Sequence, residues 1–262
     1  MIKALVFDAY GTLYDVQSVA DITDAAFPGY GDYITQIWRM KQLEYSWLRS
    51  LMEKYEDFWQ VTTDSLGYTL QSLGFEPNQQ LFDDLADAYN HLRPYPDAEK
   101  TLQSLSHYRL AILSNGSPQM LAALVKNTGL DRYLEKTISV HTRSVFKPHP
   151  RAYKLVEEEL GVTPSEVLFI SSNGFDVCGA KSFGFKVARV ERVAPETLQQ
   201  ELRTESVIGP KTMFKAMRMR AENHGQKADF TLRSLAELAD LPFLFEAAGS
   251  AGHNKTFGAG SR

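Results

Sequence analysis

Five short apolar segments recur along the chain. They are IKALVF (2–7), LAILSN (110–115), TISV (137–140), EVLFISS (166–172) and FKVARV (185–190). Each segment has the length of a strand, is rich in β-branched or aromatic residues, and is bounded by turn residues. A nearly continuous apolar run of this kind is typical of a parallel strand that is buried on both faces. The pattern therefore predicts a parallel sheet.

Helical patterns lie between these apolar segments, over 96–106, 117–129 and 150–161. Pro118 stands near the start of the second pattern and Gly129 just beyond its end, as is usual for a helix. Strands that alternate with helices form a parallel sheet covered by helices on both faces. We therefore expect an α/β, doubly wound, Rossmann-like core domain.

One long segment interrupts this alternation. Between about Asp15 and Leu92 no strand pattern occurs, and apolar residues recur at helical spacing. We predict an all-helical cap domain over 15–92, inserted after the first strand, with the core domain formed by 1–14 and 93–248. The last residues, 249–262, are rich in Gly and Ser and are predicted to be disordered.

Composition and charge narrow the class of protein. The chain has 262 residues, 44% hydrophobic and 23% charged, as in soluble globular enzymes, and its net charge of −4 gives no basic field for nucleic acid. No apolar run approaches the roughly 18 residues of a membrane span, and the first apolar run already carries Asp8. The single cysteine, Cys178, excludes an intrachain disulfide. We expect a cytoplasmic protein with no nucleic-acid or membrane partner.

Polar side chains gather where the predicted strands end. Asp8 ends the first strand, Ser114 and Asn115 end the second, and residues 171–173 end the fourth, with Asp176 one short loop later. Ligands of open parallel sheets bind beyond the carboxyl ends of the strands. Each residue alone fits a turn or helix cap. Their shared position favours a catalytic site.

Four short motifs in this region carry a family resemblance. DAYGTL contains Asp8 and Thr12, LSNG contains Ser114, KPHP contains Lys147 and SSNGFD contains Asp176. In order and spacing they resemble the four motifs of the haloacid dehalogenase superfamily. The amino acids within each motif, together with the helical insert, are similar to those of the L-2-haloacid dehalogenases, and the resemblance covers roughly residues 1–225.

Tyr10 distinguishes this pattern from that of the phosphatases in the superfamily. Those enzymes use a second aspartate two residues after the nucleophile to protonate the leaving alkoxide, and they hold Mg²⁺. A halide leaves without a proton, so tyrosine at this position agrees with carbon–halogen cleavage. The resemblance therefore implies no metal and no other cofactor, although Asp8 and Asp176 together are a carboxylate pair that a divalent ion can bind.

The resemblance also implies catalytic roles. Asp8 is expected to displace halide from a short L-2-haloalkanoate and to form an ester, which water then hydrolyses to a D-2-hydroxyalkanoate. Asp176 is the expected base for that water. The remaining catalytic residues implied are Thr12, Lys147, Ser171 and Asn173.

A second group of residues is expected to bind the substrate and the halide product. Arg39, in the cap, resembles the halide-binding arginine of the family, and Asn115 and Phe175 are expected to complete the halide cradle. Ser114 and Asn115 are candidates to hold the substrate carboxylate. The candidate apolar walls are Tyr10, Leu43, Trp47, Phe58 and Tyr153; for Trp47 and Phe58 packing between cap helices is the favoured alternative. Gln42 has no assigned role.

Alternatives of other classes remain open at this stage. The main ones are a phosphatase of the same superfamily, acting on a small phosphate ester, and a non-catalytic binding protein that keeps the fold. The segment GFDVCGAKS (174–182) is one residue too long for a phosphate-binding loop. The helix KTMFKAMRMR (211–220) is interpreted as a core or subunit-contact helix, in preference to an anion patch. The resemblance suggests a homodimer formed through the insert and the C-terminal helices.

Overall fold

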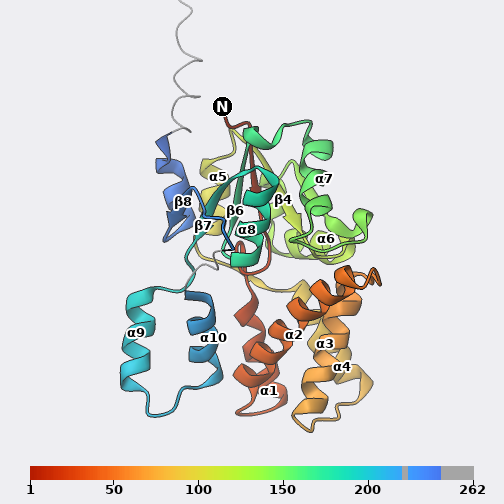
Figure 1. The fold of residues 1–262 in the computed structure, drawn as a ribbon. Helices are drawn as coiled ribbons and strands as arrows, with labels where there is room; N and C mark the ends of the chain where they lie inside the picture. Colours follow the sequence, from red (N-terminus) through yellow and green to blue (C-terminus); the bar gives the residue numbers. More distant parts are fainter. Residues whose placement is uncertain (220–223, 243–262) are drawn as a thin grey trace, which may run out of the picture.

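A six-stranded parallel sheet forms the centre of the molecule (Figure 1). The computed structural model describes residues 1–219 and 224–242. Every neighbouring pair of strands in the sheet is parallel, which confirms the predicted fold class. From edge to edge the strands are β5 (Lys136–Ser139), β4 (Arg109–Ser114), β1 (Ala4–Phe7), β6 (Val167–Ser171), β7 (Lys186–Val190) and β8 (Phe230–Leu232).

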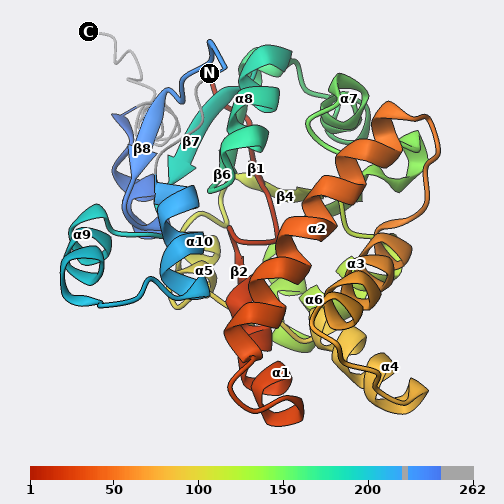
Figure 2. The same ribbon diagram turned by 60° about the horizontal axis from the view of Figure 1, so that its bottom comes forward.

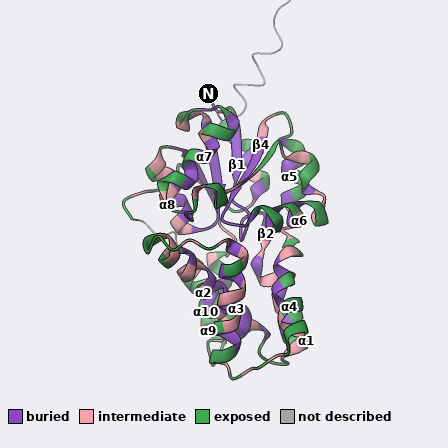
Figure 3. Cartoon of the chain, turned by 90° about the vertical axis from the view of Figure 1, so that its right-hand side faces the viewer, coloured by how far each residue is buried: buried purple, intermediate pink, exposed green. Residues whose placement is uncertain are grey.

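Helices cover both faces of this sheet. Figure 3 shows α7 (Pro150–Leu160) and α8 (Gly174–Phe183) on one side of the strands, with α5 (Ala98–Ser104) and α6 (Pro118–Thr128) on the other. Helix α6 begins and ends as the sequence predicts. Ser117 caps its first turn by accepting a hydrogen bond from the backbone of Met120, and Gly129 ends it with φ 68°.

The helical insert leaves the core after β1. It contains α1 (Ala20–Ala26), α2 (Gly31–Leu51), α3 (Phe58–Ser72) and α4 (Gln79–Asp87), which lie together beyond one end of the sheet (Figure 1). The two connections to the core run side by side, because β2 (Tyr14–Asp15) pairs with β3 (Arg93–Pro94) in an antiparallel manner. The expectation of an all-helical cap after the first strand is confirmed.

Two further helices, α9 (Pro195–Thr204) and α10 (Pro210–Met219), follow β7. Helix α10 packs against α2 of the cap, as Figure 2 shows. The predicted tail, 249–262, lies outside the described residues. Within the described part of the chain, no helix is long and apolar enough to span a bilayer. Short 3₁₀ helices complete the fold at Val16–Val19, Ala88–Asn90, Leu130–Tyr133, Val140–Arg143, Pro164–Glu166 and Leu235–Asp240.

Strand β1 lies inside the sheet, between β4 and β6. All four residues of β1 and all five of β6 are fully buried, as expected for central parallel strands. The carboxyl ends of β1, β4 and β6 face the cap (Figure 1). The fold therefore brings the chain segments that follow these strands beneath the cap helices.

Candidate active site

Asp8 is held rigidly at the carboxyl end of β1. Its backbone amide donates to the carbonyl of Ile170 over 2.9 Å, and only 4% of the residue is exposed. The next residues turn sharply, because the amides of Thr12, Leu13 and Tyr14 all donate to the carbonyl of Ala9. This turn keeps the Asp8 carboxylate close to the ends of the neighbouring strands.

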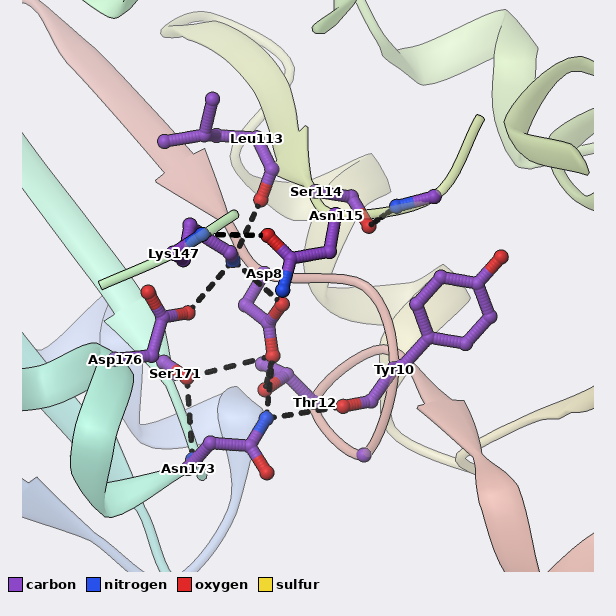
Figure 4. Close-up of polar contacts among 12 residues, drawn as sticks. Asp8, Tyr10, Thr12, Leu113, Ser114, Asn115, Lys147, Ser171, Asn173 and Asp176 are labelled. Carbon is purple, nitrogen blue, oxygen red and sulfur yellow. Dashed lines mark hydrogen bonds and ion pairs between the residues drawn. The ribbon is translucent and has the colours of Figure 1, made fainter. Parts of the chain in front are cut away.

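Four side chains donate hydrogen bonds to the Asp8 carboxylate (Figure 4). Oδ1 accepts from Lys147 Nζ over 2.8 Å. Oδ2 accepts from Thr12 Oγ1 over 2.9 Å, from Asn173 Nδ2 over 2.7 Å and from Ser171 Oγ over 3.4 Å. Bonds to an ionised oxygen are the strong ones. The carboxylate is therefore stabilised as an anion and fixed in orientation.

Lys147 joins the two carboxylates of the site. Its ammonium group, on a side chain that is 1% exposed, donates to Asp8, to Asp176 Oδ2 over 2.7 Å and to the carbonyl of Leu113 over 2.9 Å. Burial disfavours the charged ammonium, but the carboxylates of Asp176 and Asp8 outweigh this effect and raise the pKa of Lys147. The lysine is thus a fixed positive charge.

Asp176 is fully buried behind Asp8, near the start of α8. The Tyr153 hydroxyl donates a hydrogen bond to Asp176 Oδ1 over 2.7 Å, and the Lys147 ammonium group donates one to Oδ2. Burial, together with the charge of Asp8, raises the pKa of Asp176 to about 6 despite the stabilising effect of Lys147. A carboxylate with this pKa is a stronger base than an exposed aspartate and is still ionised at neutral pH.

A small chamber lies directly against Asp8, between the core and the cap. Its volume of about 10 Å³ corresponds to roughly one water molecule. An outer cavity of about 340 Å³ shares four of its lining residues, Arg39, Leu43, Asn173 and Phe175. The remaining residues that line the chamber are Asp8, Tyr10, Phe58, Asn115 and Lys147.

Arg39 supplies a positive charge to the wall of the chamber. The residue is 3% exposed and lines both hollows, and its Nη1 donates to Gln42 Oε1 over 2.6 Å. Gln42 in turn donates to Thr62 Oγ1 over 2.8 Å. Among the described residues, Arg39 forms no ion pair with a carboxylate. Since the amide of Gln42 is neutral, the charge of Arg39 remains available to an anion in the chamber.

The structure brings most of the predicted site residues together. Every predicted catalytic residue except Asp176 contacts Asp8 directly, and Asp176 joins it through Lys147. Of the predicted substrate-binding residues, those on the chamber wall are Tyr10, Arg39, Asn115 and Phe175. Asn115 also fixes the lysine, because its Oδ1 accepts from the backbone amide of Lys147 over 2.8 Å.

Two predicted substrate-binding residues lie away from the chamber wall. Ser114 is fully buried, and its hydroxyl accepts from the backbone amide of Gly116 over 3.2 Å. Tyr153 is also fully buried and is bonded to Asp176. Its position indicates that it orients Asp176, a contact that the helix-face pattern of the sequence around it did not reveal.

Arg218 was not among the predicted site residues. Helix α10 carries it to the wall of the outer cavity, where its Nη2 donates to Asn173 Oδ1 over 2.9 Å and to Ser172 Oγ over 3.0 Å. The interpretation of 211–220 as a helix for packing alone is therefore incomplete. The sequence offered little signal, because the residue lies outside all four motifs.

The arrangement suits nucleophilic chemistry on a small anion. One buried carboxylate is held by donors, while a lysine and an arginine supply positive charge around a small chamber. Within residues 1–219 and 224–242 no group of three or more His, Cys, Asp or Glu side chains has the geometry of a metal site. The predicted site itself contributes two carboxylates, Asp8 and Asp176.

Comparisons with known proteins agree with this geometry. The family model for haloacid dehalogenase-like hydrolases matches residues 2–184. The chain is similar to the (S)-2-haloacid dehalogenase of Xanthobacter autotrophicus, with 60% identity over 92% of this chain and 95% of the relative. It is also similar to the (S)-2-haloacid dehalogenase of Pseudomonas sp. (strain YL), with 45% identity over 73% of this chain and 83% of the relative.

A solved structure gives the same result. The L-2-haloacid dehalogenase of X. autotrophicus with chloropropionic acid covalently bound superposes with a TM-score of 0.88 at 59% identity, over 92% of this chain and 98% of that chain. The identity and coverage leave no doubt about descent. The chain belongs to the haloacid dehalogenase-like hydrolases, on the branch of the (S)-2-haloacid dehalogenases.

Proposed function

We propose that the protein hydrolyses short L-2-haloalkanoates to D-2-hydroxyalkanoates and halide, without a metal ion. The observation that carries the proposal is the surroundings of Asp8: four donors hold one carboxylate against a small chamber, and Tyr10 stands where a phosphatase needs a second acid. The relative from X. autotrophicus, which holds chloropropionic acid covalently, supports a covalent route.

In the first step Asp8 attacks the carbon that bears the halogen. An oxygen of the carboxylate forms a bond to that carbon while the carbon–halogen bond breaks and the halide leaves with the electron pair. Attack from the side opposite the halogen inverts the carbon. The donors to Asp8, above all Lys147 and Asn173, hold the nucleophile in place, so the reaction needs little reorganisation at the moment of attack.

The departing halide needs a positive, partly dry environment. Arg39 meets this requirement, because it lies on the chamber wall, is buried, and has no carboxylate partner among the described residues. Asn115 and Phe175 lie on the same wall. We assign the halide to this corner of the chamber, and the substrate carboxylate to the side of Asn115 nearest β4.

In the second step water hydrolyses the ester at the carbonyl carbon of Asp8. This restores the Asp8 carboxylate and leaves the new carbon–oxygen bond of the product intact, so the single inversion is retained. Asp176 is the proposed base for that water. Its raised pKa supports this role, and its bonds to Tyr153 and Lys147 fix its orientation.

A phosphatase activity is the alternative that a test must exclude. Tyr10 is a poor replacement for the acid that a phosphatase needs here, since burial raises the pKa of its hydroxyl and makes it a far weaker acid than an aspartic acid. Its ring instead packs against Phe58 and Tyr89, at centroid distances of 5.5 and 6.2 Å. Tyr10 therefore forms an apolar wall.

Halide release tests the proposal directly. The purified protein is incubated with L-2-chloropropionate in the presence of a chelator, and with p-nitrophenyl phosphate and Mg²⁺ in a parallel reaction. Chloride release with inverted product supports the proposal; phosphate release alone would replace it with the phosphatase. Single turnover in ¹⁸O water places one heavy oxygen in Asp8, and Asp8→Asn abolishes release while the protein still folds.

Three broader proposals follow the same reasoning. The boundaries of the core (1–14 and 93–248) and cap (15–92) coincide with the paired connections β2 and β3, which suits a hinge. A homodimer is supported by exposed apolar residues on α9, α10 and the loop between them, namely Leu202, Val207, Ile208, Met213 and Met217. Light scattering of the pure protein tests whether it is a dimer.

A cytoplasmic location is supported by the single, buried Cys178.

A further inference from the structure

Arg218 reaches the active site from outside the four motifs. It lies in the last turn of α10 and contacts the segment after β6 through a single nitrogen, Nη2. The guanidinium group lies over the turn after Asp8: a methyl group on Gly11, which has φ +87°, would come within 3.1 Å of Nη2. The lack of a side chain at Gly11 is what allows this close approach.

The contacts of Arg218 are with neutral groups. Among the described residues it forms no ion pair with a carboxylate; its partners are the Asn173 carboxamide, the Ser172 hydroxyl and the ring of Phe214, 5.2 Å away. Burial lowers the pKa of Arg218, and the negative charges of Asp8 and Asp15 offset this effect only in part, so placing the positive charge here has a net cost. A cost of this kind is expected where a charged group serves a functional site.

The bond to Asn173 determines which way its carboxamide faces. An arginine only donates, so its contact must be with Oδ1, over 2.9 Å. The Nδ2 group of Asn173 is then directed to Asp8 Oδ2 over 2.7 Å and to the Tyr10 carbonyl over 3.0 Å. A flipped carboxamide would place Oδ1 against the Asp8 carboxylate and Nδ2 against the Arg218 guanidinium group. The flipped state is therefore disfavoured at both ends, by Arg218 at one and by Asp8 and the Tyr10 carbonyl at the other.

We propose that Arg218 is a positioning residue of the dehalogenation reaction, acting through Asn173 to keep the Asp8 carboxylate oriented for attack on carbon. This inference rests on the proposed function. It also links α10, which packs against α2 of the cap, to the nucleophile in the core.

The test is a double-mutant cycle with Arg218→Met, Asn173→Ala and the double variant. Single-turnover chloride release from L-2-chloropropionate, with enzyme in excess, reports the attack by Asp8. Loss of one bond to an oriented amide predicts a rate about ten- to a hundredfold lower for Arg218→Met, with KM changed less than about threefold. The double variant is expected to be as slow as Asn173→Ala alone, because both changes remove one chain of contacts.

Two controls keep the result interpretable. Lys215→Met removes a charge from the same helix, where Lys215 pairs with Glu201 of α9, and should leave the rate unchanged. Arg218→Gln keeps a donor and serves if the methionine variant does not fold; its defect should be smaller in the same cycle. Wild-type release of chloride establishes the proposed function independently of both variants.

Two results would overturn the inference. A double variant slower than Asn173→Ala by the full Arg218→Met factor would show that the arginine acts independently of the amide. A defect that appears only in KM and disappears at high salt would show that Arg218 merely attracts the anionic substrate.

Discussion

Removing the charge of Lys147 should expose the electrostatic balance of the site. The ammonium group is the sole ion-pair partner of Asp8 and Asp176 among the described residues, at 2.8 and 2.7 Å, and all three side chains are at most 6% exposed. Lys147→Met keeps most of the side-chain volume and removes the charge. Two buried carboxylates then face each other without compensation, so halide release should be lost and the fold weakened.

The size of the stability loss follows from burial. Breaking a buried ion pair by removing one partner costs about 3–5 kcal/mol, because the remaining charge stays desolvated. The loss should depend on pH. Without Lys147 one carboxyl group binds a proton more tightly in the native state than in the unfolded chain, so the native state binds more protons. The variant therefore regains stability as pH falls.

Urea unfolding, followed by circular dichroism from pH 8 to pH 5, measures this effect. The difference in free energy of unfolding between wild type and variant should be largest at pH 8 and should narrow as the pH falls towards about 6, by up to about 1.4 kcal/mol per pH unit. Below about pH 6 the wild-type Asp176 is protonated as well, so the difference should then level off. Lys136→Met is the matched control, because its pair with Glu159 is exposed and is expected to contribute less than about 1 kcal/mol. A loss at Lys147 that is as small as the control, or constant with pH, would refute this account.

Three other predictions follow from the contacts of the site. Because burial raises the pKa of Asp176 to about 6 and the base must be ionised, turnover should fall as pH drops through 6, and the Asp8 ester should accumulate at pH 5, where intact-mass spectrometry detects it. Tyr153→Phe removes the 2.7 Å bond to Asp176 and should slow ester hydrolysis about ten- to a hundredfold while the first burst of halide stays unchanged. Gln42→Glu sets a carboxylate on Arg39 and should lower kcat/KM for halide release more than tenfold, whereas Gln42→Met should have a smaller effect, in steady-state assays.

The sequence predicted the fold well because local patterns and the buried sheet agree. Continuous apolar runs gave β1, β4, β5, β6 and β7, and the absence of such runs gave the helical cap. One short element near the C-terminal end was not predicted, because its hydrophobic pattern is weak. This element is strand β8, which is only three residues long.

The residues of the candidate site also differ in how far the sequence could place them. Side chains at strand ends, such as Asp8 and Asn173, could be placed because parallel strands end at a common edge. Arg218 could not, since its position depends on how α10 returns to the core after a loop and another helix. Tyr153 was selected as a wall residue, and only three-dimensional packing shows its hydroxyl beneath Asp176. A contact that forms only when a distant helix packs back against the core leaves no pattern in the local sequence.

The charges around the chamber explain why one carboxylate can attack an anion here. Lys147, Arg39 and Arg218 are three positive groups, and Asp8 and Asp176 are two negative ones. The other charged residues that line the outer cavity are paired, Glu44 with Lys41 and Arg189 with Glu191. The site therefore carries one net positive charge, which a monoanionic haloalkanoate neutralises. A phosphate ester with two negative charges would leave one uncompensated, and a buried uncompensated charge is strongly unfavourable. The same count predicts that removing Arg39, which lines the chamber and has no carboxylate partner among the described residues, weakens binding of a monoanion.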